Sequence, residues 1–122
     1  MYSSPSSTEL LQAVKTFIDG VSKDQLTGHA KFHARVAMNV LDTVIREIEQ
    51  RPEAEASEHK RLLELLNTTP DADTDALNHA LGEAIRTGVI GLDDVKLRDH
   101  LKRTTIAQLL IDQPRYSGLD PA

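Results

Sequence analysis

Two histidines four residues apart are the side chains in this sequence that most resemble part of a metal site. His29 and His33 form an H-x-x-x-H pattern, which on a helix puts both imidazoles on one face, within reach of one ion. The metalloprotease version has Glu directly after the first His, where Ala30 stands here. A catalytic zinc also needs a third protein ligand, and no spacing nominates one. We therefore predict that His29 is exposed and that His33 is a hydrogen-bonded core histidine.

A ladder of polar side chains follows on the same segment. Arg35, Asn39, Asp42 and Arg46 succeed one another at helical spacing, so Asp42 can pair with Arg46 and also reach Asn39. If a neighbouring helix covers the ladder, it is a buried polar network that could bind an anion or fix the packing. If solvent covers it, it is the wet face of the helix. Because exposed ion pairs contribute little free energy, we favour a solvated or purely structural role.

Other catalytic patterns are incomplete. Asp71, Asp73 and Asp75 alternate as in a calcium loop, but Ala76 and Gly82 stand where that loop needs Gly and Glu. The glycines occur singly, without a phosphate-binding loop, and no G-x-S-x-G elbow is present. The sequence contains no cysteine, which excludes disulfides and thiol nucleophiles. We predict no catalytic residues and no cofactor.

These side chains lie on the segment around which the rest of the chain is predicted to pack. In residues 28–50 the apolar side chains sweep roughly 240° of a helical wheel, whereas an ordinary surface helix shows about 100°. A helix that is apolar on so many sides should be surrounded by others. We therefore predict that residues 28–50 form the central helix of a bundle, ending before Pro52, which disfavours helical geometry in the preceding residue.

Helical periodicity also predicts the remaining elements. Ser6 and Glu9 form a capping box for the first helix. Asp73 or Thr74 is expected to cap the fourth helix, and Asp93 the fifth. The four further helices are expected at residues 8–21, 53–66, 75–87 and 94–111.

Composition fits one soluble helical domain. At 122 residues, with 39% apolar and 27% charged side chains, the chain is expected to be an all-α, single-domain bundle of about five helices over residues 8–118. Residues 1–7 and 119–122 are expected to be tails. The net charge of −5 argues against nucleic acid and anionic membranes as partners. Without a basic, apolar leader or a bilayer-spanning stretch, we expect a cytoplasmic location.

Three segments carry a resemblance: FHARVAMNVLDTVIREIE, ALNHALGEAIRTGVI and HLKRTTIAQLLIDQPRYSG. They resemble a small bacterial all-helical domain family of unknown function. Its members are found beside aminoglycoside-phosphotransferase-like kinases and acyl-CoA dehydrogenases, either fused or encoded by neighbouring genes. The resemblance covers about residues 9–118 and implies no activity. By position it points at Phe32, His33, Arg35, Val36 and Asn39, and at Asp112, Pro114, Arg115 and Tyr116.

Two functional hypotheses follow. The first is a non-catalytic accessory module that docks onto a kinase-like or acyl-CoA dehydrogenase-like partner, or forms a homodimer through the apolar second half of residues 94–111. The second is a small ligand-binding or metal-dependent enzyme that uses His33 with Arg35, Asn39 or a second histidine. We favour the first, because function is argued from a site and no complete site is visible. The residues that would bind a ligand are His33, Arg35, Asn39, Arg46, Arg115 and Tyr116.

Overall fold

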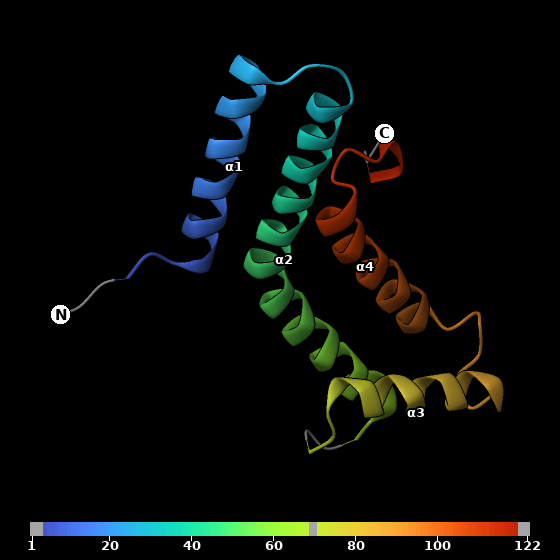
Figure 1. Cartoon of the computed structure of the whole chain (residues 1–122). Coiled ribbons are helices and arrows are strands. Elements are labelled where there is room, and N and C mark those ends of the chain that lie inside the picture. Colours follow the sequence, from blue (N-terminus) through green and yellow to red (C-terminus); the bar gives the residue numbers. More distant parts are fainter. Residues whose placement is uncertain (1–3, 69–70, 120–122) are drawn as a thin grey trace. The chain divides into compact units, whose positions relative to one another are not determined.

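The chain is all-helical over the residues that the computed structural model describes, 4–68 and 71–119 (Figure 1). This confirms the predicted fold class, but the described residues hold four α-helices and not five. None of these helices is long and apolar enough to cross a bilayer. The ends of the two predicted tails, residues 1–3 and 120–122, lie outside the described residues. The elements are α1 (Ser7–Gln25), α2 (Gly28–Leu66), α3 (Thr74–Arg86), α4 (Val95–Asp112) and the short 3-10 helix η1 (Ser117–Leu119).

The missing helix is explained by α2, which continues through Pro52. The segments predicted as separate helices, 28–50 and 53–66, are one helix of 39 residues. Proline inside a helix removes one hydrogen bond and costs about 3 kcal/mol. However, the residues that follow it, Glu53 to Ala56, are mostly strong helix formers. The helix therefore continues through Pro52, because this single unfavourable position does not outweigh the helix formers that follow it.

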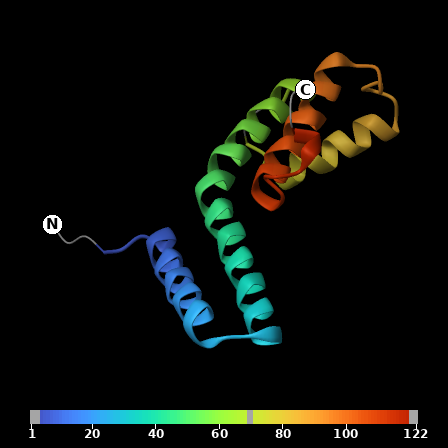
Figure 2. The same ribbon diagram turned by 90° about the horizontal axis from the view of Figure 1, so that it is seen from above.

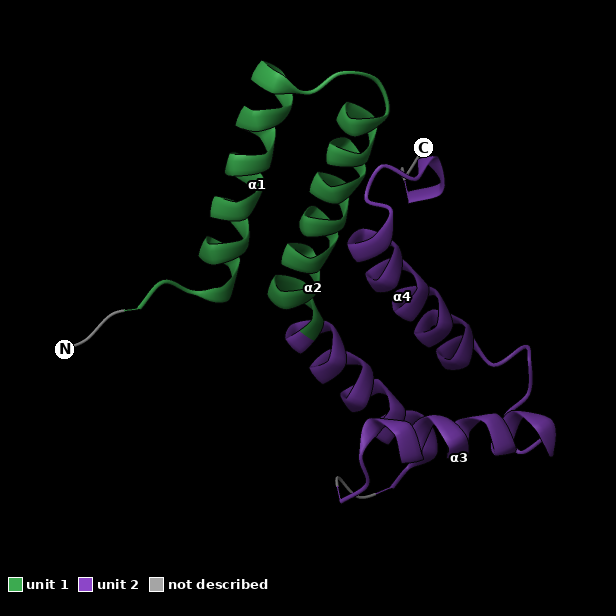
Figure 3. Cartoon of the chain, viewed as in Figure 1, with its two compact units in different colours: residues 1–51 green, residues 52–122 purple. Residues whose placement is uncertain are grey.

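The chain divides into two compact units, residues 1–51 and 52–122 (Figure 3). Unit 1 is a helical hairpin in which α1 and the first part of α2 run antiparallel (Figures 1 and 2). Its connector is only Leu26–Thr27, followed by Gly28 at φ 59°. Lys15 Nζ and Asp42 Oδ1 join the two helices at 2.7 Å. The predicted capping box is confirmed, since Ser6 and Glu9 satisfy each other's backbone amides.

The prediction that residues 28–50 are surrounded on all sides is wrong. In the described part of unit 1, only Ser22 and Ala34 are buried. Five large apolar side chains of α2 remain between 39% and 58% exposed. Periodicity identified these side chains as apolar, but it does not specify how many neighbours cover a helix, and the hairpin supplies only α1. The five are Phe32, Val36, Val40, Val44 and Ile48.

The hydrophobic core of large side chains lies in unit 2. The C-terminal part of α2 contributes Leu62, α3 contributes Leu77 and Leu81, and α4 contributes Leu97, all between 0% and 5% exposed. Leu63, Leu65, Leu66, Ala72, Ile85 and Ile90 pack around this cluster. Three helical segments thus converge on a leucine core, and this core positions the polar contacts described below.

The ends of α3 and α4 are set by local chemistry. The Asp73 carboxylate accepts a hydrogen bond from the backbone amide of Ala76 at 2.8 Å, which confirms Asp73 as the cap of α3. The cap of α4 is Asp94, whose carboxylate accepts from the Leu97 amide at 3.0 Å. The prediction of Asp93 was wrong by one residue, because only Asp94 combines an extended backbone with a carboxylate three residues before that free amide.

Candidate functional site

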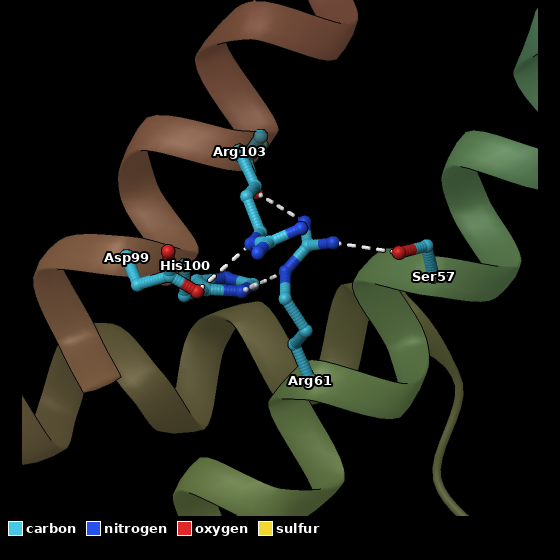
Figure 4. Close-up of polar contacts among 6 residues, drawn as sticks. Ser57, Arg61, Asp99, His100 and Arg103 are labelled. Atoms are coloured by element: carbon cyan, nitrogen blue, oxygen red, sulfur yellow. Dashed lines mark hydrogen bonds and ion pairs between the residues drawn. The ribbon is translucent and has the colours of Figure 1, made fainter.

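A polar cluster joins α2 to α4 within unit 2 (Figure 4). The Arg61 guanidinium donates through Nε to His100 Nδ1 at 3.1 Å. It also donates through Nη1 to Ser57 Oγ at 2.7 Å and through Nη2 to Thr104 Oγ1 at 3.1 Å. Ser57 lies one turn before Arg61 on α2, and Thr104 one turn after His100 on α4. We call Ser57, Arg61, His100 and Thr104 the Arg61 cluster.

His100 is the buried titratable group of this cluster, with 2% of its surface exposed. Because Nδ1 accepts a hydrogen bond from Arg61, the imidazole is neutral and carries its proton on Nε2. Burial lowers the pKa of His100 below 6.5, and the positive charge of Arg61 lowers it further. The carboxylates of Glu58 and Asp99 act in the opposite direction without reversing the shift. His100 therefore stays uncharged at neutral pH.

Further polar contacts surround the cluster. On α4, Arg103 Nε donates to Asp99 Oδ2 at 2.9 Å, with both side chains largely exposed (Figure 4). Between α2 and α3, His59 Nδ1 and Thr74 Oγ1 lie 3.3 Å apart. The contact of His59 with Thr74 connects α2 to α3, whereas that of Arg103 with Asp99 lies within α4.

The geometry of the Arg61 cluster supports a structural role. Arginine has five N–H donors, and three of those of Arg61 already bond to protein acceptors on two helices. His100 is buried, and its Nδ1 lone pair is occupied by Arg61. A general base would need a free lone pair facing its substrate, whereas the Nδ1 lone pair of His100 faces Arg61. The arrangement thus fastens α4 to α2.

The two histidines of the H-x-x-x-H pattern lie near the start of α2. His29 is exposed, as predicted. His33 is exposed too, so the prediction of a core histidine is wrong. Its ring meets Phe32 edge-on, with centroids 5.8 Å apart. The reason is again that within the hairpin only α1 packs against α2, so this side of α2 stays exposed. Over residues 4–68 and 71–119 no group of three or more His, Cys, Asp and Glu side chains could hold a metal ion.

The polar side chains of the predicted ladder on α2 make contacts that the spacing did not predict. Asp42 pairs with Lys15 of α1. Arg46 Nη2 donates to Thr43 Oγ1 at 3.2 Å, while the Thr43 hydroxyl donates to the backbone carbonyl of Asn39. Asp42 and Arg46 are half-buried, whereas the side chains of Arg35 and Asn39 are exposed. The structure thus uses Asp42 to hold α1, a partner that spacing within one helix could not reveal.

Arg115 and Tyr116 lie in unit 2, in the turn after α4. Both are exposed, Tyr116 to 51%. The Tyr116 backbone amide donates to the carbonyl of Gln113 at 2.9 Å, and its own carbonyl accepts from the Leu119 amide at 3.1 Å. A side chain at Gly118 would overlap the Tyr116 ring. The contacts described for Tyr116 are thus those of the backbone of this turn.

Sequence reasoning missed the Arg61 cluster. In the sequence, Arg61 follows Lys60 in a short basic run, and His100 is one of five histidines. A usable signal does exist in α4, where Leu97, His100 and Thr104 follow at intervals of three and four residues. Polar residues on the face of a buried leucine predict a buried hydrogen bond. The identity of the partner could come only from the packing of α4 on α2.

Comparison with known proteins gives one family. Residues 24–116, which are more than half of the chain, match the domain of unknown function DUF6285. No curated protein and no solved structure matches the chain.

Proposed function

The chain belongs to the DUF6285 family, and from this premise we propose that it is a non-catalytic helical module that works by docking onto other proteins. The family description assigns no activity. The proposal therefore rests on the surfaces and polar groups of the chain itself.

The observation that carries the proposal is an uncovered apolar surface on unit 1. Its side chains come from both helices of the hairpin and are between 39% and 71% exposed. Together they expose on the order of 700 Å² of apolar surface, above the roughly 300–600 Å² of the largest patch on a typical monomer. Surfaces of this kind are protein contact sites. This surface, the hairpin face, consists of Leu10, Val14, Phe17, Phe32, Val36, Val40, Val44 and Ile48.

The polar groups of unit 2 support the same proposal. A catalytic site needs a general acid or base with access to its substrate. The most perturbed titratable group, His100, is instead buried and bonded to Arg61. Its Nδ1 lone pair accepts the hydrogen bond from Arg61 that links α4 to α2.

For the partner, the family resemblance nominates an aminoglycoside-phosphotransferase-like kinase or an acyl-CoA dehydrogenase-like enzyme in a bacterial cytoplasm. The module would bind or stabilise that enzyme without taking part in its reaction.

The experiment is a binding assay with purified partners. The chain is mixed with the kinase-like and the dehydrogenase-like protein of the same source, and complexes are separated by size-exclusion chromatography. Val40→Glu puts a charge into the hairpin face, whereas Gln12→Glu adds the same charge to an exposed position of α1 outside it. We expect one enzyme to co-elute with the wild type and Gln12→Glu but not with Val40→Glu. Binding of neither enzyme, or equal binding of all three chains, contradicts the proposal.

A second candidate function is favoured by the exposure of His33. Together with the exposed Arg35 and Asn39, this imidazole is accessible to a ligand or metal ion. Arg46 would be a further binding residue of unit 1, while Arg115 and Tyr116 are separate candidate binding residues in unit 2. Metal analysis of protein purified without a histidine tag, with thermal melts of His33→Ala and Arg35→Ala, tests this enzyme-like role. A stoichiometric metal, or a loss of ligand binding at unchanged stability, supports it.

A further inference from the structure

We propose that the hairpin face is covered by the hairpin face of a second copy of the chain, so that two hairpins form a four-helix core. This inference rests on the proposed function, because it takes the hairpin face as the contact surface and names its first occupant. The second copy and a kinase-like or dehydrogenase-like partner would then occupy the hairpin face in turn and not together.

Val14 of α1 and Val44 of α2 lie on the same side of the hairpin, whereas Phe32, at the start of the α2 row, lies about 160° around the helix from Ala34 and points away from α1. Ser22 and Ala34 are the buried residues where α1 and α2 meet. At about 100° per residue, Val14 lies about 80° from Ser22, and Val44 lies about 80° from Ala34, in the same rotational sense. Because the helices run antiparallel (Figures 1 and 2), an equal sense of rotation places both side chains on one side of the hairpin.

The hairpin register makes this surface continuous. The Lys15–Asp42 ion pair, 2.7 Å long, fixes which residues of the antiparallel helices lie side by side. Counting outward from this pair, Phe17 lies at the level of Val40, and Val14 lies within one residue of the level of Val44. Leu10 likewise falls within one residue of the level of Ile48. The α1 row therefore lies beside the second half of the α2 row.

The area is that of a dimer interface. A standard protein interface buries about 800 Å² on each partner, and the exposed apolar side chains of the hairpin face supply on the order of 700 Å². A two-helix hairpin cannot enclose a core of its own, and the residues buried inside it are the small Ser22 and Ala34. Two hairpins stacked face to face give the four-helix arrangement that does enclose one.

The row on α2 is complementary to itself. Phe32, Val36, Val40, Val44 and Ile48 follow at intervals of four, so they form one continuous ridge along α2. A two-fold axis at Val40 places Phe32 opposite Ile48 of the second copy and Val36 opposite Val44. Larger side chains meet at the ends and three valines fill the middle. In a two-fold interface each such contact occurs twice.

The charges near this row agree with the same pairing. Glu47 falls opposite His33 of the second copy, so a carboxylate faces an imidazole. Arg51 falls opposite His29 and keeps its ion pair with Glu47 of its own helix, at 2.8 Å. No pair of like-charged carboxylates or ammonium groups meets at the centre, where the valines lie. Electrostatic complementarity of this kind selects one register over others.

The first test is the mass of the purified chain by size-exclusion chromatography with light scattering. At about 10 μM chain we expect a dimer for the wild type and for Gln12→Glu. Val40→Glu brings two carboxylates together at the axis, so we expect its dissociation constant to rise by about tenfold or more. Glutamate is no worse a helix former than valine, and circular dichroism checks that the helices are retained.

The second test examines the register. The natural sequence has no cysteine, so Val40→Cys places one thiol per chain at the proposed axis, and Gln12→Cys serves as the control. Under mild oxidation we expect rapid, near-complete disulfide-linked dimer for Val40→Cys and little for Gln12→Cys. A monomeric wild type overturns the inference, as does equal cross-linking of the two variants. If the wild type is monomeric while Val40→Glu still loses its enzyme partner, the dimer fails and the docking function stands.

Discussion

Replacing Leu97 by alanine tests whether unit 2 holds the core of the protein. Leu97 is 1% exposed and packs with Leu62, Leu77 and Leu81 from two other helical segments. Removing such a side chain costs its transfer free energy and leaves a cavity, together about 2–5 kcal/mol. A chain of this length melts about 3–5 °C lower for each kcal/mol lost. We therefore expect a fall of about 10 °C or more in the melting temperature, measured by circular dichroism, with urea unfolding for the free energy.

Leu101→Ala is the matched control for this experiment. Leu101 lies one turn later on the same helix but is 46% exposed, so its truncation should cost about 1 kcal/mol or less. Both substitutions change helix propensity equally, and this contribution cancels in the comparison. Equal losses for the two variants would refute the assignment of the core to the leucine cluster. The same conclusion would follow if Leu97→Ala melted like the wild type.

Three further predictions concern single positions. Because the pKa of His100 in the folded chain is below 6.5, the unfolded chain binds more protons in acid, and the free energy of unfolding should fall as the pH drops below 6.5. His100→Asn retains an acceptor for Arg61 and should flatten this fall in urea titrations at several pH values, whereas the exposed His79→Asn should not. Gly88 has φ 80°, a conformation that strains alanine but not glycine. Gly88→Ala should therefore lower the free energy of unfolding by about 1 kcal/mol in the same titrations, and an unchanged midpoint would contradict this reasoning. Pro52→Ala restores a helical hydrogen bond within α2 and should raise the free energy of unfolding by up to about 3 kcal/mol, and a lower melting temperature would contradict this reasoning.

The sequence predicts those parts of the fold that local chemistry determines. The class, the capping box at Ser6 and Glu9 and the cap at Asp73 follow from residue type and short spacing, and the structure confirms them. The break at Pro52 failed because the preference of one residue was weighed above the helix formers after it. The cap at Asp93 failed by one position because two aspartates stand side by side.

The candidate site was less predictable because it depends on pairings between elements. The contacts of Arg61 with His100 and Thr104 join residues 39 and 43 positions apart. Helical periodicity shows which side of α4 these two residues occupy, but not which helix faces it. The same limit explains why the ion pair of Asp42 with Lys15 on α1 was not predicted. The exposure of His33 likewise depends on how many helices cover α2.

The two-residue connector Leu26–Thr27 limits the ways in which α1 can move. Two residues span at most about 7 Å, so α1 has no slack to slide along its neighbour into another register. It can pack against α2, or it can separate from α2 as an intact helix. Any exchange of α1 between copies would require the connector to straighten so that α1 and α2 form one continuous helix. The positive φ of Gly28 is not helical and therefore opposes this. The length of the connector thus keeps α1 in one register beside α2.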